Sequence, residues 1–292
     1  MTRQPVIARR AEALLDSAVI ATAPVAGGDI ATATKLRLSD GTTALMKTHP
    51  RPPEGFFAAE MRGLRWLGAV EAGVPVPEVL AGDDECVILR WVEQGKPGAE
   101  AATAFGTALA ATHAAGAPGY GAVDDAGAHT DGFIGRLPLA NRGADSWAEF
   151  YAERRVLPYL RLGRDRGSVT EDQVSVIESV LPRLAELVPE EGPARVHGDL
   201  WNGNVLWGHD GHAHIIDPAA HGGHRETDLA MLSLFGLPQL AKVLDAYDAT
   251  APLGDGWRDR VGLHQLHPLL VHACLFGGGY AARAAAVVSA FA

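Results

Sequence analysis

The stretch VHGDLWNGNVLW, Val196 to Trp207, places one histidine, one aspartate and two asparagines between apolar residues. Further along the chain, the sequence IIDP occupies Ile215–Pro218. Apolar residues on both sides of the polar ones predict two short strands, with the polar side chains in the loop that joins them. Loops held by a rigid scaffold carry a large share of binding and reactive groups. We therefore expect this loop to carry chemistry as well as turn the chain.

The polar residues of this loop have a spacing that is typical of phosphoryl transfer. Four residues separate Asp199 from Asn204, and in kinase catalytic loops the spacing D-x-x-x-x-N places a base beside a metal ligand. Asp217 supplies a second oxygen ligand from the end of the next strand. Asn204 and Asp217 could then share Mg²⁺ while Asp199 accepts a hydroxyl proton. An isolated Asp-Asn pair is more often part of a turn or a helix cap, so the other residues below decide the interpretation.

Three features nearer the N-terminus favour the phosphoryl-transfer interpretation. Lys47 lies on a predicted strand, from which it could reach ATP phosphates under a loop. Glu60 lies on the following helix, where an ion pair would fix the Lys47 ammonium group. Gly27 and Gly28 precede the predicted hairpin, and glycine lets backbone N–H groups approach phosphate oxygens. Taken singly, these residues would also fit a solvated lysine, an exposed glutamate and an ordinary turn.

The order of these residues along the chain predicts the fold. A glycine loop, a strand lysine, a helix glutamate, a connector after a strand and then the two aspartates follow the order that builds an ATP cleft between two lobes. We expect an α+β, two-lobed, protein-kinase-like fold with a small β-rich N-lobe and a larger, mainly helical C-lobe. Near residues 93–98 the sequence changes from mixed strand and helix patterns to mainly helical ones. This change predicts an ATP-binding lobe over 1–93 and a catalytic and substrate-binding lobe over 94–292.

Hydrophobic periodicity supports this division of the chain. Before the boundary we expect a helix over Arg3–Ser17, a hairpin around Asp40-Gly41, a helix over 56–70 and a strand over Cys86–Val92. After it, helical patterns cover Ala99–Ala115, Trp147–Leu160 and Thr170–Leu187. Residues 116–143 are rich in glycine and aspartate and predict a long loop. The alanine-rich end, Leu269–Ala292, predicts buried helices, because His272, Arg283 and a glycine run interrupt a possible membrane span.

Composition limits the classes of partner. The chain has 292 residues and a formal net charge of −10, which disfavours a nucleic acid or an anionic membrane surface. Cys86 and Cys274 have neither metal nor redox spacing, so we expect both to be reduced and buried. The N-terminus lacks the apolar core of a signal peptide. We therefore expect a cytoplasmic monomer that acts on small molecules or proteins.

Several longer motifs now identify a resemblance. They are GGDI at 27–30, DGTTALMK at 40–47, FFAAEMRGLRWL at 56–67, HGDLWNGN at 197–204, DPA at 217–219 and GHRETDLAMLSLFG at 223–236. With these motifs the sequence resembles the fructosamine kinase (ketosamine-3-kinase) family, a branch of the kinase-like fold close to aminoglycoside and choline kinases. The resemblance spans nearly the whole chain, and the tryptophan of HGDLWNGN and the GHRETDLAM stretch are its more specific parts.

The resemblance implies a substrate class. The family phosphorylates the sugar 3-hydroxyl of ketoamines, which form when sugars glycate amines, including lysines of proteins. The product then decomposes and releases the amine, so the implied role is deglycation repair. The implied acceptor is a fructosamine, ribulosamine or erythrulosamine, free or bound to protein, and the implied cofactors are ATP and Mg²⁺.

The resemblance also implies roles for single residues. Asp199 would be the base, Asn204 and Asp217 the metal ligands, and Lys47 and Glu60 the pair that anchors the phosphates. Backbone groups near Arg90–Val92 would contact adenine. Trp201 would lie against the sugar or its amine, which a ring face attracts, although a core tryptophan is the alternative. Further substrate contacts are expected from Asp131 and Asn141. For Arg225, Glu226 and Asp228 a structural salt-bridge network is at least as good an interpretation as substrate contact.

The sequence departs from the family in places and leaves alternatives open. Asp29 stands where many relatives have a cysteine, so thiol regulation is not expected at that loop. The sequence has DGFIG at 131–135 and PLAN at 138–141, where relatives usually have DNYIG and PQ-x-N. These differences put the family's acceptor pocket in question for this chain. The acceptor could therefore be another small hydroxyl compound, such as an aminoglycoside, a choline-like or a homoserine-like molecule. A metal-dependent hydrolase is a remoter alternative, prompted by His197, His209, His212, His214, His221 and His224.

Overall fold

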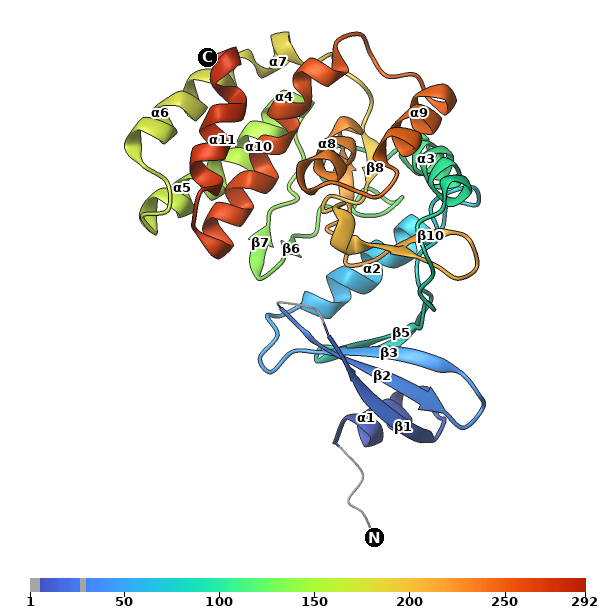
Figure 1. The fold of residues 1–292 in the computed structure, drawn as a ribbon. Helices are drawn as coiled ribbons and strands as arrows, with labels where there is room; N and C mark the ends of the chain where they lie inside the picture. Colours follow the sequence, from blue (N-terminus) through green and yellow to red (C-terminus); the bar gives the residue numbers. More distant parts are fainter. Residues whose placement is uncertain (1–5, 27–29) are drawn as a thin grey trace.

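The computed structural model describes residues 6–26 and 30–292, and these form two lobes (Figure 1). The N-lobe holds a five-stranded antiparallel sheet of order β1-β2-β3-β5-β4. Its strands are β1 (Val19–Val25), β2 (Thr32–Leu38), β3 (Thr43–Thr48), β4 (Val79–Gly82) and β5 (Cys86–Arg90). The C-lobe is mainly helical. The two-lobed, protein-kinase-like α+β fold expected from the sequence is therefore confirmed.

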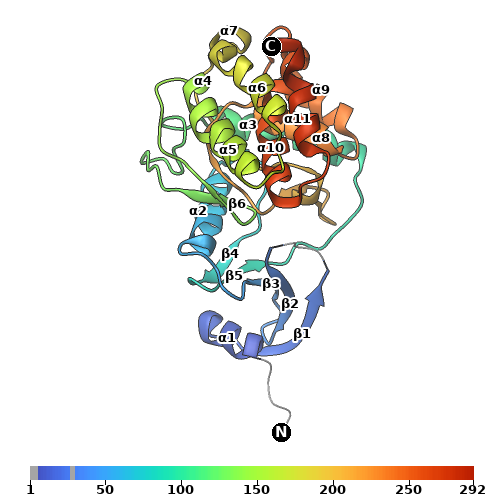
Figure 2. The same cartoon turned by 90° about the vertical axis from the view of Figure 1, so that its left-hand side faces the viewer.

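The two faces of the N-lobe sheet have different partners. Helix α1 (Val6–Leu15) covers the face away from the C-lobe (Figures 1 and 2). On this face Leu36, Met46 and Ile88 form a buried cluster with the alanines of α1. Lys47 on β3 is paired with Ala33 of β2 and with Val87 of β5. Strand residues alternate between faces, so Lys47 points to the opposite side from Met46. The sheet thus presents Lys47 toward the C-lobe.

The hairpin between β2 and β3 forms as its turn chemistry predicts. The carboxylate of Asp40 accepts a hydrogen bond from the Thr42 N–H at 2.8 Å, which is the local bond that aspartate makes in turns. Gly41 has φ of 89°, a left-handed conformation that suits glycine. The turn fixes the register of β3 and with it the position of Lys47.

Helix α2 (Phe56–Gly68) lies between the sheet and the helices of the C-lobe (Figure 1). Its Phe57 and Leu64 are fully buried against Val87 and Leu89 of β5. At its other end the Trp66 ring lies under the guanidinium of Arg195, 4.6 Å from the ring centroid. The helix therefore packs on both lobes, and this position carries Glu60 into the space between them.

The C-lobe contains two large buried clusters of apolar side chains. One is built around the long helix α10 (Trp257–Phe276), and it includes Leu266, Leu269 and Leu270. The other joins α3 (Ala99–Ala114) to α8 (Glu226–Phe235) and α9 (Leu240–Thr250). The C-lobe also contains the α-helices α4 (Trp147–Phe150), α5 (Leu157–Asp165), α6 (Glu171–Val180), α7 (Leu184–Leu187) and α11 (Tyr280–Val288).

Two short antiparallel pairs frame the Asp199 loop. Strand β8 (Ala194–Val196) pairs with β11 (His221–Gly223), and β9 (Val205–Trp207) pairs with β10 (Ala213–Ile215). The loop of Asp199 leaves β8 and enters β9, and Asp217 follows the end of β10. The two aspartates are thereby placed on neighbouring loops of the same small framework.

The structure also differs from the expectations in two places. Residues 116–143 are not only a loop, because β6 (Gly132–Ile134) and β7 (Leu137–Leu139) form a hairpin there. The helix expected over Trp147–Leu160 contains a π-helical segment, Tyr151–Val156. Strands of three residues are too short to show an alternating pattern, and a π-bulge leaves no periodic signal. In the described part of the chain, no helix has the length and apolar character needed to cross a membrane.

Candidate active site

A buried carboxylate binds the backbone at the start of the Asp199 loop. Asp228 on α8 has no exposed surface, and its two oxygens accept hydrogen bonds from the N–H groups of His197 at 2.7 Å and Gly198 at 2.9 Å. His113 on α3 lies 3.1 Å from the same carboxylate. Burial alone would raise the pKa of Asp228, but hydrogen bonds from the His113 side chain and the His197 backbone help to lower it. Asp228 therefore stays ionised and orients the start of the loop.

His197 joins the two loops that carry the aspartates. Its Nε2 donates to the carbonyl oxygen of Ile216 at 2.8 Å, and its Nδ1 accepts from the Asp199 N–H at 3.2 Å. This pair of bonds defines one neutral tautomer, and burial lowers the pKa of His197 accordingly. A second bond, from the Ile216 N–H to the Asn204 carbonyl at 3.0 Å, ties the same loops together. The spacing between Asp199 and Asp217 is thereby set by the His197 ring and by a backbone hydrogen bond.

Asp199 and Asn204 lie in direct contact, as the loop spacing predicts. The Asn204 Nδ2 donates to the Asp199 carbonyl oxygen at 2.8 Å and to its Oδ2 at 3.2 Å. Asn204 is buried and Asp199 is half-buried. Burial, together with the negative charge of Asp217, raises the pKa of Asp199 well above the usual range. A carboxylate with a raised pKa is a stronger base, closer in pKa to the proton it would accept.

Lys47 connects the N-lobe to this pair of loops. Its Nζ lies 2.6 Å from Oε1 of Glu60 and 2.6 Å from Oδ1 of Asp217. Burial by itself would lower the pKa of Lys47, but the two carboxylates outweigh burial and raise it. Burial raises the pKa of Glu60, and the attraction of Lys47 offsets this only in part. The ammonium group therefore stays charged and faces two acidic groups from different lobes.

The remaining oxygen atoms fit a hard divalent cation. The side-chain carbonyl oxygen of Asn204 and the second carboxylate oxygen of Asp217 accept no hydrogen bond from the residues that the structure describes. Carboxylate and amide oxygens are the ligands that Mg²⁺ takes from proteins. Asp217 also has φ of 55°, an unusual conformation for a residue other than glycine and one that clusters at functional sites.

The connector between the lobes contains backbone donors that are free within the described residues, and Val92 N–H is one of them. The N–H groups of Arg90 and Trp91 donate to the carbonyls of Glu78 at 2.8 Å and Thr43 at 3.0 Å. The Val92 N–H has no acceptor within residues 6–26 and 30–292. The Arg90 side chain is exposed and pairs with Glu78. Of the residues expected to meet adenine, Val92 thus offers a free backbone group, while Gly27 and Gly28 lie outside the described residues.

Trp201 is a surface residue of the Asp199 loop, with 37% of its area exposed. Its backbone N–H donates to the Asp199 carbonyl oxygen at 3.2 Å, so the Trp201 backbone lies directly beside Asp199. The ring contacts Phe235 edge-on at a centroid distance of 5.9 Å. A core position, the alternative interpretation from the sequence, does not describe this exposed ring.

Asp131 and Asn141 lie at the base of the β6–β7 hairpin. Asp131 is exposed, and its carboxylate accepts from the Asn141 N–H at 2.8 Å. Asn141 is buried, and its amide bonds the Thr130 carbonyl on one side and the Arg155 guanidinium on the other. Both ends of the Asn141 amide are therefore occupied by protein groups. This geometry makes Asn141 a support of the hairpin, while Asp131 keeps an exposed carboxylate oxygen.

Within residues 6–26 and 30–292, the histidines named from the sequence do not form an open metal centre. His209 and His212 are exposed and His214 bonds Asp210 at 2.9 Å. His221 donates to the Ala219 carbonyl at 2.8 Å, and burial lowers its pKa to about 3. These contacts give each ring a local structural partner or leave it in solvent. They do not bring three rings to one point around an accessible ligand position.

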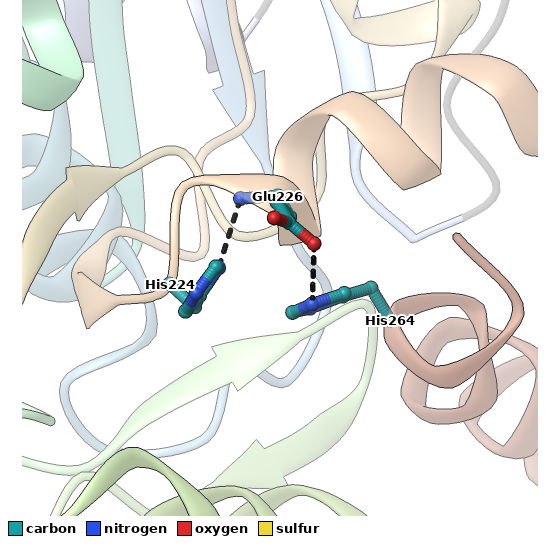
Figure 3. Close-up of side chains that lie close together, drawn as sticks. All are labelled: His224, Glu226 and His264. Carbon is teal, nitrogen blue, oxygen red and sulfur yellow. Dashed lines mark hydrogen bonds and ion pairs between the residues drawn. The ribbon is translucent and has the colours of Figure 1, made fainter. Parts of the chain in front are cut away.

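The one group in the described residues with metal-like clustering is His224, Glu226 and His264 (Figure 3), whose ligand atoms lie within 4.8 Å of one another. Both Glu226 oxygens are already bound by Arg260, at 2.5 Å and 3.2 Å. His224 Nδ1 accepts from the Glu226 N–H at 3.2 Å, so its Nε2 holds the proton when the ring is neutral. Burial lowers the pKa of His224 to about 3. The cluster is therefore an ion-paired support of α8.

The chain is similar in sequence and in fold to known phosphotransferases. The chain matches the fructosamine kinase family over residues 4–291. A probable ketoamine kinase of Enterococcus faecium is 33% identical over 89% of this chain and 91% of its own length. The structure of a fructosamine-3-kinase candidate from Thermobifida fusca is 48% identical, covers 98% of both chains and has a TM-score of 0.91. The streptomycin–ATP complex of the aminoglycoside phosphotransferase APH(2″)-IIa, 12% identical over 99% of this chain and 96% of its own with a TM-score of 0.64, shares the fold.

Proposed function

The chain belongs to the fructosamine kinase family and is a phosphotransferase, and on this premise we propose that it phosphorylates the sugar 3-hydroxyl of a ketoamine with ATP. The observation that carries this proposal is the meeting of Lys47, Glu60 and Asp217 from both lobes beside the Asp199–Asn204 pair. The acceptor would be a fructosamine, ribulosamine or erythrulosamine, free or on a protein lysine. Loss of the phosphorylated sugar would then repair the glycated amine.

The proposed reaction balances as a direct transfer. The acceptor oxygen forms a bond to the γ-phosphorus of ATP, the bond from that phosphorus to the bridging oxygen breaks, and ADP leaves. Asp199 accepts the hydroxyl proton, a role that its raised pKa supports. Lys47, fixed by Glu60, would neutralise the phosphate oxygens. Holding ATP and acceptor in line would supply much of the rate, because there is little covalent chemistry for the protein to do.

Two further groups would complete nucleotide binding. Asn204 and Asp217 would hold Mg²⁺, which when bound neutralises the charge of the β- and γ-phosphates. The free N–H of Val92 would donate to adenine from the connector. The ATP-binding lobe would then comprise residues 1–93 and the acceptor lobe residues 94–292. The ATP-bound relative of the same fold supports the choice of nucleotide.

The cellular setting is part of the proposal. The free and buried Cys86 and Cys274 support a reducing compartment such as the cytoplasm. The net charge of −10 supports partners other than nucleic acid or an anionic membrane surface. We expect a monomer, because the cleft would draw both its lobes from one chain.

The experiment that tests the function measures ADP release with Mg²⁺ against an acceptor panel. The panel contains free and lysine-linked fructosamine, ribulosamine and erythrulosamine, with aminoglycosides, choline and homoserine as competing acceptors. We expect turnover on one or more ketoamines, with phosphate on the 3-hydroxyl by NMR. The Asp199→Asn variant should lose turnover and keep ATP binding, whereas Asp172→Asn, on the exposed side of α6, should match the wild type. Turnover confined to another alcohol would refute the ketoamine assignment.

A further inference from the structure

An exposed aromatic strip begins at Trp201 on the Asp199 loop and runs along the C-lobe to Phe276. Five large apolar side chains are exposed in the described residues, and three of these, Trp201, Phe235 and Phe276, belong to one chain of ring contacts. The other two, Val6 and Ile20, lie in the N-lobe. Scattered exposed apolar residues need no explanation, but a contiguous exposed group marks a binding surface.

The strip is continuous from ring to ring. Trp201 contacts Phe235 at a centroid distance of 5.9 Å, Phe235 contacts His272 at 4.9 Å, and His272 contacts Phe276 at 5.5 Å. Tyr280 lies 5.1 Å from the same imidazole. Phe235 and Phe276 are the last residues of α8 and α10, and a glycine with positive φ follows each. The chain turns away after each ring, which leaves the rings at the helix ends exposed.

His272, in the middle of the strip, is a neutral ring of defined tautomer. Its Nδ1 donates to the Pro268 carbonyl oxygen at 2.7 Å, and burial lowers its pKa. The charge-free imidazole continues the apolar surface between the two phenylalanines, and its Nε2 remains an acceptor. The strip therefore presents rings and one hydrogen-bond acceptor, without a charge of its own.

The helix ends beneath the strip are already neutralised. Arg136 donates to the Leu275 carbonyl, Arg166 to the Cys274 carbonyl and Arg283 to the Leu234 carbonyl. Such bonds occupy the negative ends of α10 and α8, where a cation would otherwise be attracted. With guanidinium groups at its edge, the part of the strip from Phe235 to Phe276 is suited to an apolar ligand segment and not to an ammonium group.

We propose that this strip binds the alkyl stem of the amine that carries the sugar, and the inference rests on the proposed ketoamine kinase function. In a ketoamine the nitrogen is only a few bonds from the 3-hydroxyl, so an acceptor placed at Asp199 has its nitrogen near Trp201. Substituents on that nitrogen then extend over Phe235 and Phe276. The methylene groups of a lysine side chain form an apolar stem that packs along rings in this way.

This arrangement makes the amine a determinant of specificity. Full burial of each methylene group corresponds to roughly a fourfold gain in affinity. A lysine-linked ketoamine should therefore be preferred over the ketoamine of methylamine with the same sugar. The preference should reside mainly in KM, because the stem is bound equally in the ground state and the transition state.

The test compares two ketoamines, one on the ε-amine of Nα-acetyl-lysine amide and one on methylamine, each with the sugar that the wild type turns over fastest. We expect kcat/KM to favour the lysine-linked acceptor by about tenfold. Phe235→Ala and Phe276→Ala should each reduce this ratio by about threefold, and the double variant should bring it near one. Phe276→Leu should retain most of the preference, because leucine still covers the stem. Ile20→Ala, a matched truncation of an exposed apolar residue in the N-lobe, should not change the ratio.

The outcomes separate the strip from the function. Equal kcat/KM for the two ketoamines in the wild type, or an unchanged ratio in the folded phenylalanine variants, would refute the proposed role of the strip. Neither result would contradict the proposed ketoamine kinase function. Turnover of neither ketoamine, with turnover of another alcohol, would overturn the proposed function and the strip together. Thermal melting of each variant identifies a folding defect, and in that case the wild-type ratio of the two ketoamines decides.

Discussion

Lys47 and Asp217 lie 170 positions apart in the sequence, yet Nζ of the lysine is 2.6 Å from Oδ1 of the aspartate. The same ammonium group lies 2.6 Å from Oε1 of Glu60. The contact joins a strand of the N-lobe to a loop of the C-lobe through one partly buried cation. In the proposed reaction this cation would meet the phosphates, so its removal should affect both nucleotide binding and the contact between the lobes.

Replacement of Lys47 by methionine should reduce kcat/KM by about 100-fold or more, because a preorganised charge at the transferring phosphate is lost. The variant should also be less stable by about 3 kcal/mol, since two carboxylates would face each other without a cation. Steady-state kinetics and urea unfolding measure the two effects. Lys242→Met, on the exposed side of α9, is the control and should change neither. A Lys47→Met enzyme of normal activity would remove this lysine from the mechanism.

Replacement of Glu60 by glutamine should have a smaller effect, with kcat/KM lower by about tenfold. Lys47 would keep Asp217 as a partner, but its ammonium group would no longer be held on the α2 side. If Glu60 acts only through Lys47, the double variant should resemble Lys47→Met alone, because the two effects are not additive for residues in one network. Additive losses would show that Glu60 has a separate function.

Local patterns were sufficient for much of this fold. The hairpin at Asp40-Gly41 and the helix that begins at Phe56 were predicted because turn chemistry and apolar periodicity act over a few residues. The fold class followed from the order of the motifs and is confirmed by structural similarity. The roles of Lys47, Asp199 and Asp217 remain predictions, although the structure brings these side chains together.

The contacts that hold the site could not be predicted in the same way. The sequence suggested a structural salt-bridge network for Arg225, Glu226 and Asp228. Arg225 does pair with Glu191, and Glu226 with Arg260. Asp228 instead binds backbone N–H groups thirty residues away. Such a contact depends on the packing of α8 beneath β8, and no local spacing encodes it.

Replacement of Asp228 by asparagine should loosen the Asp199 loop. An amide has one acceptor oxygen, so its NH₂ group would face one of the N–H donors of His197 and Gly198. We expect a loss of about 3 kcal/mol of unfolding free energy and a lower kcat, with little change in KM for ATP. Asp248→Asn at the end of α9 is a matched control outside the site. Unchanged kcat in a folded Asp228→Asn enzyme would argue against a positioning role.

The two thiols should be unreactive in the folded protein. Cys86 and Cys274 are both buried, and burial raises the pKa of Cys86 above its usual range and that of Cys274 to about 11. The thiolate is the reactive form, so iodoacetamide should label neither at mildly alkaline pH. Denaturant should expose both to labelling, and mass spectrometry counts the adducts. Labelling of the native enzyme at stoichiometric levels would contradict the described burial.

Replacement of Asp199 by asparagine should stabilise the protein while it abolishes turnover. Burial and the charge of Asp217 raise the pKa of Asp199 in the folded chain, so the ionised form is favoured more in the unfolded chain than in the folded one. The wild type therefore loses stability as the pH rises through this raised pKa. Near neutral pH the variant should have a higher Tm than the wild type. Its free energy of unfolding should be larger by on the order of 1 kcal/mol. The difference should disappear below the usual pKa of an aspartate, where both side chains are neutral.

Calorimetry across this pH range measures the difference in stability between the variant and the wild type, with Asp172→Asn as the control. A Tm difference that does not depend on pH would show that the gain has another origin than the charge of Asp199.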